Sequence, residues 1–369
     1  MSTKTTLVTL KSIPEGIPNV DDFEIIESII RSPEQGEFLA ETIYLALDPY
    51  IRVTMVGRHF FSTPGIGDVP RGSTISRVIS SKHDSFKEGD LVVMESGMQS
   101  HAISDGHDVH HVDTGSAPIT TALGILGMPG FTAYSALLGP AQLKEDDVVL
   151  VSAASGAVGS MVGQISSIKN ANVIGIAGGS EKCKWTIENA SMNECIDRKS
   201  EDIDKKLTEF CPHGVDIFFD NTGGDIQTIV LSKHLAQNSR IILSGMISQY
   251  NSSKPPSGPN LGNICKQRAT IYGFVVYDFD HMRDSFIRDA SGWYEDGLLN
   301  YSEDLVYGIE KTPNHFIKLM KGENFGKFAH GQNRVPWDRK QLESFFPGPP
   351  LLRVSEGGRT LVVVITKNN

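Results

Sequence analysis

A strand, a glycine turn and a helix follow one another in the middle of this chain, and together they constrain its fold more than any other stretch. Residues 148–151 are a run of valine and leucine, which is typical of a strand buried on both faces. The pattern Ala154-x-Gly156-x-x-Gly159 comes next, followed by apolar residues at helical spacing. Gly156 would let the backbone approach a pyrophosphate, and Gly159 would let the helix pack closely on the strand. The stretch predicts either a dinucleotide-binding turn or a tight turn that holds no ligand.

Composition places the chain among globular proteins and suggests two domains. Its 369 residues are 39% hydrophobic and 21% charged. Because the net charge is −10, we expect neither nucleic acid nor a membrane as a partner. No secretory signal or membrane-spanning run is evident, and no cysteine has metal-ligand spacing. A reduced, cytoplasmic protein without a metal is the simplest interpretation.

The first 120 residues predict a compact β-rich unit, because short strands alternate with Gly- and Pro-rich turns. Candidate strands are 23–27, 40–47, 74–80 and 90–94. Asp48 and Pro49 predict a turn that carries Tyr50 and Arg52 off the end of a strand, although Tyr50 could equally pack on the domain surface.

Four histidines crowd the following segment: His101, His107, His110 and His111. Imidazoles bind metals, but no carboxylate or thiol stands at a recognisable ligand spacing. We therefore expect a solvated loop here.

After Thr120 the pattern changes to alternating strands and helices, which predicts a doubly wound parallel sheet. Ligands of such sheets lie beyond the carboxyl ends of the strands. Besides 148–151, strands are expected at 173–177, 215–220, 240–244 and 271–276. Helices are expected at 128–138, 181–189, 201–210, 226–235 and 282–296.

The residues after the second of these strands favour NADPH over NADH. Sites for NAD carry Asp or Glu about 20 residues after the glycine motif, on the ribose hydroxyl. Here Ala177-Gly-Gly-Ser180 contains no acid, whereas Lys182 and Arg198 could neutralise a 2′-phosphate. Lys182 could also be an ordinary solvated helix residue.

Eight motifs in fixed order identify a family. Together they resemble the zinc-free prostaglandin reductase, leukotriene B4 12-hydroxydehydrogenase and alkenal double-bond reductase family of the medium-chain dehydrogenase/reductase superfamily, over roughly residues 10–328. The motifs are Asp48-Pro-Tyr-Ile-Arg52, Ala102-Ile-Ser-Asp-Gly106, Gly127-Met-Pro-Gly-Phe-Thr-Ala-Tyr134, Ala153-Ala-Ser-Gly-Ala-Val-Gly159, Phe219-Asp-Asn-Thr-Gly-Gly224, Gly245-Met-Ile-Ser-Gln-Tyr-Asn251, Gly273-Phe-Val-Val-Tyr277 and Asn324-Phe-Gly-Lys327.

The resemblance implies an α/β fold, with a GroES-like β-rich catalytic domain and a doubly wound parallel-sheet Rossmann domain. We expect the first over 1–122, the second over 123–300, a return to the catalytic domain over 301–330, and an atypical tail over 331–369. It also implies a homodimer that uses NADPH to reduce the C=C bond of small enone or enal substrates, such as 15-oxoprostaglandins and alkenals, in lipid metabolism.

The family's functional residues can be placed by motif, as the resemblance implies them. The cofactor would be held by Gly156, Ala157 and Val158 under the pyrophosphate, with Gly159 in the same turn, by Lys182 at the 2′-phosphate, by Asn221 and Asn324, and by Phe274 and Val275 near the nicotinamide. The family often has Tyr where Arg198 stands, and Arg198 would serve the same phosphate. Tyr50 and Tyr250 would line the substrate and the nicotinamide ribose, with Tyr250 also touching the cofactor.

The expected chemistry assigns those tyrosines a catalytic part. Hydride transfer to the β-carbon leaves an enolate, which Tyr250, or a ribose hydroxyl ordered by Tyr250, would stabilise. The α-carbon would then take a proton from Tyr50, Tyr250 or water. Alternatively, both tyrosines only shape the pocket, and solvent supplies the proton.

Two stretches depart from the family. Residues 57–72 should border the substrate, so substrate choice stays open. The tail either supplies the last strand from 360–366 or is a divergent end that does not pack. Alternative functions are a zinc-free quinone oxidoreductase and a non-catalytic NADPH-binding protein.

Overall fold

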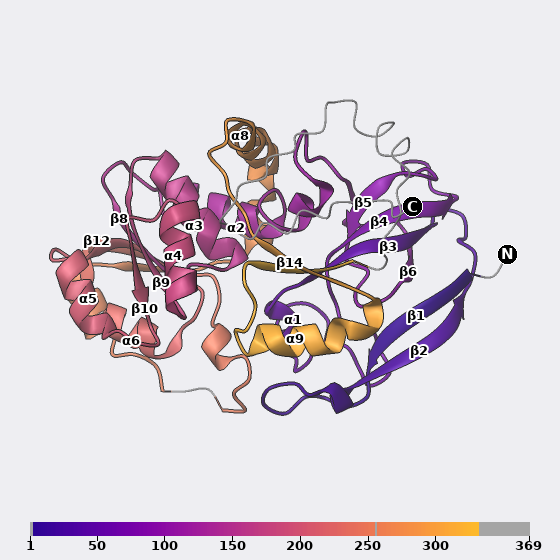
Figure 1. Ribbon diagram of the computed structural model, residues 1–369, viewed down its shortest axis with the longest axis horizontal. Helices are drawn as coiled ribbons and strands as arrows, with labels where there is room; N and C mark the ends of the chain where they lie inside the picture. Colours follow the sequence, from indigo (N-terminus) through magenta and orange to yellow (C-terminus); the bar gives the residue numbers. More distant parts are fainter. Residues whose placement is uncertain (1–2, 255–256, 332–369) are drawn as a thin grey trace, which may run out of the picture.

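A computed structural model describes residues 3–254 and 257–331. An α/β half and a β-rich half lie at opposite ends of the molecule, with α2, α8, α9 and β14 between them (Figure 1). The mixed content of one parallel and one antiparallel sheet confirms the predicted fold class.

Six parallel strands between residues 148 and 273 form the sheet of the α/β half, in the order β10-β9-β8-β11-β12-β13. All of the strands expected after Thr120 belong to it, although one of them begins at Leu235, earlier than expected. The strands are β8 (Val148–Ser152), β9 (Asn172–Ala177), β10 (Glu194–Asp197), β11 (Val215–Asp220), β12 (Leu235–Leu243) and β13 (Thr270–Gly273).

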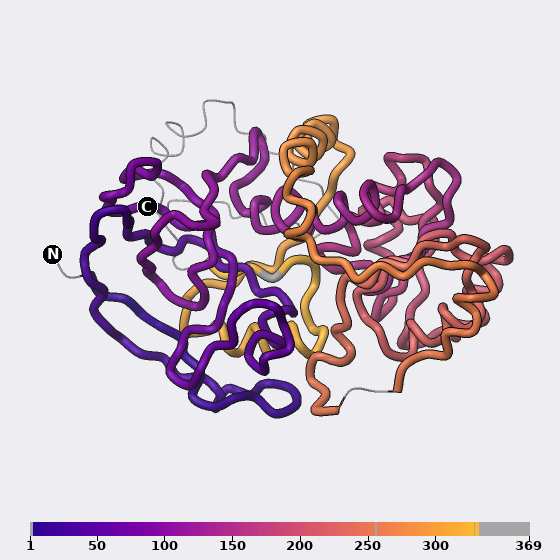
Figure 2. Tube along the Cα trace, turned by 180° about the vertical axis from the view of Figure 1, so that it is seen from behind, coloured from indigo at the N-terminus to yellow at the C-terminus, as the bar shows by residue number. Residues whose placement is uncertain are grey.

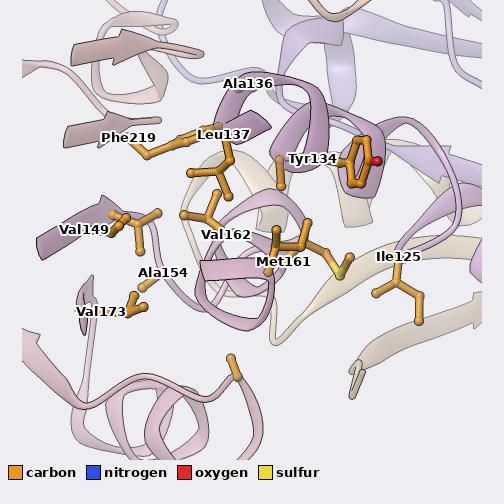
Figure 3. Packing of buried hydrophobic residues seen from close by; sticks show 14 of the residues in the cluster. Ile125, Tyr134, Ala136, Leu137, Val149, Ala154, Met161, Val162, Val173 and Phe219 are labelled. Carbon is orange, nitrogen blue, oxygen red and sulfur yellow. The ribbon is translucent and has the colours of Figure 1, made fainter. Parts of the chain in front are cut away.

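Helices cover both faces of this sheet, because neighbouring strand residues point to opposite sides. Val149 and Phe219 pack against Leu137 and Val162 on one face, as Figure 3 shows. Leu150 and Phe218 belong to a separate cluster on the other face. The helices are α2 (Met128–Leu138), α3 (Ala157–Ile168), α4 (Ser180–Asn189), α5 (Ile203–Phe210), α6 (Gly224–Lys233), α7 (Gly262–Gln267) and α8 (Arg283–Glu295).

The other half contains a mainly antiparallel sheet in the order β14-β15-β3-β4-β5-β7, with β6 also paired to β3. Its strands are β3 (Phe38–Leu47), β4 (Thr74–Ser81), β5 (Leu91–Met94), β6 (His101–Ser104), β7 (His110–His111), β14 (Glu303–Tyr307) and β15 (Lys327–Gly331). A separate ribbon of β1 (Thr3–Leu10) and β2 (Phe23–Ile30) lies at the edge of the molecule (Figure 1).

The expected histidine loop is wrong in two places. His101 begins β6, which pairs with β3, and His110 and His111 form β7, which pairs with β5. The short runs carry little strand signal of their own, so their conformation comes from the neighbouring strands. Only His107 lies in a connection between strands, where it is exposed.

The chain returns to the antiparallel sheet near its described end. β15 pairs antiparallel with β3 and parallel with β14, and α9 (Thr312–Met320) connects the two returning strands. Lys327, the last residue of the Asn324–Lys327 motif, begins β15. The strand expected at 360–366 lies outside the described residues, and the domain boundaries stay a prediction. Figure 2 shows the return (yellow) beside the indigo N-terminal part.

Short helical segments complete the described structure. They are α1 (Tyr50–Thr54) and the 3-10 helices η1 (Val20–Asp22), η2 (Ile119–Leu123), η3 (Ile247–Gln249), η4 (Val276–Met282) and η5 (Ile309–Lys311). Across residues 3–254 and 257–331, none of the helices has the length and apolar character that a membrane span requires.

Candidate active site

The turn between β8 and α3 has the geometry of an anion site. Gly156 is the N-cap of α3, and among the described residues no side chain caps this N-terminus. Its N–H groups and helix dipole are suited to phosphate. A Cβ on Gly159 would lie 2.8 Å from Ala154 Cα and still closer to the Ala153 carbonyl oxygen, so only glycine fits. Ala153, and not a glycine, has the left-handed backbone (φ 52°) at the start of the turn.

A pocket lies beside this turn, where the two halves meet. The turn contributes Ser155, and the first turn of α3 contributes Ala157 and Ser160. Trp185 comes from α4, and Glu303 and Lys327 come from the returning chain. Val158 is half-buried next to Ala157. Gly124, Ile125, Tyr301, Ser302 and Gly326 complete the lining.

Three cations gather at the carboxyl ends of β9 and β10. Burial lowers the pKa of Lys182, and the positive charges of Lys199 and Arg198 lower it further. The Arg198 guanidinium lies over Gly178, where a Cβ would come within 3.3 Å of its Nε. Lys182 Nζ donates to the Gly322 carbonyl at 2.9 Å. The structure therefore brings Lys182 and Arg198 together and adds Lys199, which the sequence did not single out as a binding residue.

The nearby carboxylate of Asp197 accepts hydrogen bonds from the loop around it. The donors are Gly179 N at 2.7 Å, Lys199 N at 3.0 Å and Ser200 Oγ at 2.8 Å. Burial favours the neutral acid, but these donors outweigh it, and the pKa of Asp197 is lowered. The carboxylate shapes the loop that carries the cations.

Asn221 is anchored at the carboxyl edge of the sheet. Its Nδ2 donates to the Ser152 carbonyl at 2.9 Å and thereby joins β11 to β8. Asp220 beside it is fully buried and accepts from Ser152 Oγ, Gly223 N and Gln227 Nε2, each at 2.9 Å. This network fixes the backbone at the end of both strands.

Tyr250 and Asn221 both lie close to Gly245. A Cβ on Gly245 would lie 3.2 Å from both the Tyr250 Oη and the Asn221 carbonyl oxygen. The Tyr250 hydroxyl accepts from Met246 N at 3.3 Å, and burial raises its pKa, so the phenol keeps its proton. Arg58 donates to the carbonyl oxygens of Tyr250 and Ser252 at 2.8 and 3.1 Å and holds this loop against the β-rich half.

The side chains of Phe274 and Asn324 contact neighbouring residues. Phe274 is buried and stacks on Phe279, with ring centroids 5.0 Å apart. Val275 follows in extended backbone and is half-buried. Asn324 Nδ2 donates to the Gly326 carbonyl at 2.9 Å and orders the turn beside the pocket.

Tyr50 stands at the start of α1 and contacts a carboxylate. Its hydroxyl donates to Glu95 Oε2 at 3.2 Å, and Arg71 Nη2 lies 3.5 Å from the same oxygen. Burial, followed by the charges of Glu95 and Asp48, raises the pKa of Tyr50 well above its ordinary value. Tyr50 and Tyr250 pack against the same buried cluster, so both tyrosines border the junction of the halves.

A cluster of aromatic side chains lies next to Tyr50. The rings of His59 and Phe61 lie 5.6 and 6.1 Å from the Tyr50 ring, and Tyr277 lies 5.5 Å from Phe61. The Arg71 guanidinium covers Phe61 at 4.0 Å. Sequence reasoning missed the roles of Glu95, Arg71 and these rings. The only signals were the divergence of 57–72 and the motif that ends at Tyr277.

The rest of the Asp48–Arg52 motif is structural. Arg52 is buried and donates to the carbonyl oxygens of Pro14 and Gly16 at 2.9 and 3.0 Å. Asp48 forms a buried ion pair with Lys327. The motif therefore directs Tyr50 to the site and Arg52 away from it.

No group of three or more His, Cys, Asp or Glu residues in the described part of the chain is placed to hold a metal ion.

Comparisons with known proteins match both halves. Residues 7–112 match the family described as the N-terminal domain of oxidoreductase, and residues 157–291 match the family described as zinc-binding dehydrogenase. The NADPH-dependent curcumin reductase of Escherichia coli (strain K12) is 38% identical over 325 residues, which cover 86% of this chain and 94% of that protein. Prostaglandin reductase 1 of Bos taurus is 37% identical over 327 residues, which cover 86% and 96%.

A solved structure agrees with these relatives. CurA from Vibrio vulnificus in complex with NADPH superposes with a TM-score of 0.84 at 40% identity and covers 89% of this chain and 99% of CurA. The chain therefore belongs to the prostaglandin reductase family of the medium-chain dehydrogenase/reductase superfamily, as its motifs indicate.

Proposed function

We propose that this protein uses NADPH to reduce the carbon–carbon double bond of α,β-unsaturated ketones and aldehydes. The observation that carries the proposal is family membership together with a matching site. Named relatives are an NADPH-dependent curcumin reductase and a prostaglandin reductase. The uncapped α3 N-terminus and the cations of Lys182, Arg198 and Lys199 suit the phosphates of NADPH.

NADPH, when bound, supplies the hydride, and this chain's residues provide its surroundings. Gly156, Ala157, Val158 and Gly159 would receive the pyrophosphate on the N-terminus of α3. Asn221, at the carboxyl edge of the sheet, and Asn324, in the turn beside the pocket, would contact the cofactor. The backbone at Phe274 and Val275 continues from β13 and would form the wall at the nicotinamide.

Tyr250 and Tyr50 are proposed to handle the charge and the proton of the reaction. Each keeps its proton at neutral pH, because burial raises both pKa values. Tyr250 would donate a hydrogen bond to the oxygen that becomes an enolate, or order a hydroxyl that does so. Tyr50 would protonate the α-carbon.

The test is NADPH oxidation with 15-oxoprostaglandin, 4-hydroxynonenal and a simple quinone, each repeated with NADH. We expect loss of NADPH absorbance with the enone or the enal, and a weaker response with NADH. Turnover of the quinone alone would favour a quinone oxidoreductase. NADPH binding without turnover of any substrate would favour a non-catalytic protein.

We further propose a cytoplasmic homodimer that acts on lipid-derived enones. Within the described residues β13 pairs only with β12, so it offers an edge for a second chain. The four cysteines are free thiols, which suits a reducing compartment. Light scattering at several protein concentrations would measure the oligomeric state, and a monomer at all of them would exclude the dimer.

A further inference from the structure

Glu95 is a carboxylic acid in the substrate region that the mechanism above leaves unused. It follows β5, in the β-rich half, and its side chain is 26% exposed. Its Oε2 lies 3.2 Å from the Tyr50 hydroxyl and 3.5 Å from Arg71 Nη2. One face of this acid therefore meets the proposed proton donor, and the exposed part reaches water.

The surroundings of Tyr50 make an isolated tyrosinate costly. Tyr50 is largely desolvated, and a negative charge on it would stand beside the carboxylate of Asp48 and, whenever Glu95 is ionised, beside that of Glu95. Desolvation and like charges both disfavour the anion. If Tyr50 gave its proton to the α-carbon with no source of replacement, the pocket would hold this unfavourable charge until water entered.

We propose that Glu95 is the proton reservoir for Tyr50, delivering a proton to the tyrosine oxygen as Tyr50 protonates the α-carbon. This proposal rests on the proposed function. The electron pair of the enolate forms the new C–H bond with the Tyr50 proton, and the O–H bond of Tyr50 breaks. When Glu95 is protonated, the hydrogen bond between the two side chains reverses and Glu95 donates to the Tyr50 oxygen. The O–H bond of Glu95 then breaks, and its proton forms a new O–H bond on Tyr50. Glu95 is left as a carboxylate beside Arg71 and regains a proton from solvent.

The environment of Glu95 is consistent with its proposed role as a proton reservoir. Burial raises the pKa of Glu95, and Arg71 and the hydrogen bond from Tyr50 offset this only in part, so the acid form persists to higher pH than for an exposed glutamate. The Arg71 guanidinium is held over the Phe61 ring. Its positive charge is therefore in place to stabilise the Glu95 carboxylate that proton transfer leaves. The titratable and charged groups that face Glu95 are Asp48 of the β3–α1 turn, Tyr50 of α1, Arg71 of the segment before β4, and Tyr277 of η4, with His59 beside Tyr50 and Arg71.

Glu95 acts through Tyr50 and is thus a positioning residue, so its test needs a readout that packing alone would not change. Glu95→Gln keeps the size and the hydrogen-bonding capacity of the side chain but cannot release a proton. The wild-type kcat should fall as pH rises through the raised pKa of Glu95, because the reservoir empties. In Glu95→Gln we expect kcat to be about tenfold or more lower at about pH 6, with that dependence absent and KM for the enone within about twofold.

Two further variants sharpen the result. Tyr50→Phe in the Glu95→Gln background should cause little additional loss, because both residues belong to one route. Glu41→Gln is the matched control, since Glu41 has a similar side-chain exposure of 28% and pairs with Arg77 in the same sheet. It should leave kcat and its pH profile unchanged.

The outcomes separate the two proposals. A Glu95→Gln enzyme with the wild-type pH profile, or a loss confined to KM, overturns the reservoir while the reductase function stands. Absence of wild-type turnover with every enone overturns the function and the reservoir together. Independent of turnover, the Tyr50 signal in ultraviolet titration, read as the difference from Tyr50→Phe, should move to lower pH in Glu95→Gln. An unmoved signal contradicts the electrostatic coupling.

Discussion

At the scale of single residues, we propose that the cations of Lys182, Arg198 and Lys199 favour NADPH over NADH. Lys182, Arg198 and Lys199 lie close enough for the latter two to lower the pKa of Lys182. Like charges so near one another repel, and a 2′-phosphate would relieve that repulsion. The position of Lys182 alone left it ambiguous in the sequence, because the partner Arg198 comes from a different strand end.

Lys182→Ala and Arg198→Ala should therefore raise KM for NADPH about tenfold each, because each removes a charge-assisted hydrogen bond to phosphate. KM for NADH should change little. Steady-state kinetics with both cofactors measures the effect. Lys184→Ala is the control, since Lys184 is an exposed residue of the same helix. An equal change for NADPH and NADH would contradict the phosphate assignment.

Glu303 predicts a pH dependence of cofactor affinity. Burial raises its pKa to about 7, and it lines the pocket with Ser155 and Ala157 of the glycine turn. As pH rises through about 7, its negative charge appears next to the pyrophosphate site, so NADPH should bind about three- to tenfold more weakly at about pH 8.5 than at about pH 6. Fluorescence titration would measure this, and Glu303→Gln should flatten the curve. The same slope in both proteins would rule Glu303 out as its cause.

At the scale of elements, packing of α3 on β8 depends on one missing Cβ. Gly159→Ala would place a Cβ 2.8 Å from Ala154 Cα and closer still to the Ala153 oxygen, so backbone must shift. We expect the free energy of unfolding to fall by about 1–3 kcal/mol. Denaturant titration is the measurement.

Gly292→Ala is the matched comparison. Gly292 lies inside α8, and a Cβ there would meet nothing within 4 Å. Alanine should stabilise this helix by up to about 1 kcal/mol. If both substitutions had the same sign, the cause would be glycine flexibility and not the close approach at Gly159.

At this scale, some secondary-structure elements could be predicted from the sequence and others could not. Most strands and helices after Thr120 carry strong apolar periodicity, and the structure has them within a few residues of the expected bounds. The exceptions are β12, which begins at Leu235 and not at 240, and β10 and α7, whose bounds were not predicted. β6 and β7 were not predicted, because their short polar runs become strands only by pairing with neighbours. The longer strand β1 was not predicted either. In the site, the glycine turn and the tyrosine motifs were readable, whereas Glu95 and Arg71 matter only because distant segments meet.

At the scale of the whole molecule, the ion pair of Asp48 and Lys327 joins two segments that are far apart in the sequence. Its side chains are 11% and 5% exposed. It fixes the corner before Tyr50 to the first residue of β15. Long-range closure of this kind holds the returning strand on the sheet and the tyrosine at the site.

Lys327→Met should lower the free energy of unfolding by about 3–5 kcal/mol, because it leaves a buried carboxylate without its partner. Adding Asp48→Asn should recover part of the loss. Thermal and denaturant unfolding measure both variants. Lys184→Met, which breaks an exposed pair with Glu188, should have little effect. A loss at Lys327 as small as the one at Lys184 would show that the buried pair does not hold the return.

The sequence by itself determined the family, the parallel sheet and the glycine turn, because these depend on local periodicity and on residues close together in the chain. Only the tertiary structure decided which polar groups meet. It paired Asp48 with Lys327, placed Lys199 beside Lys182, and set Glu95 against Tyr50. Such contacts join segments far apart in the chain, and their pKa shifts depend on burial and on neighbouring charges that no sequence spacing reveals.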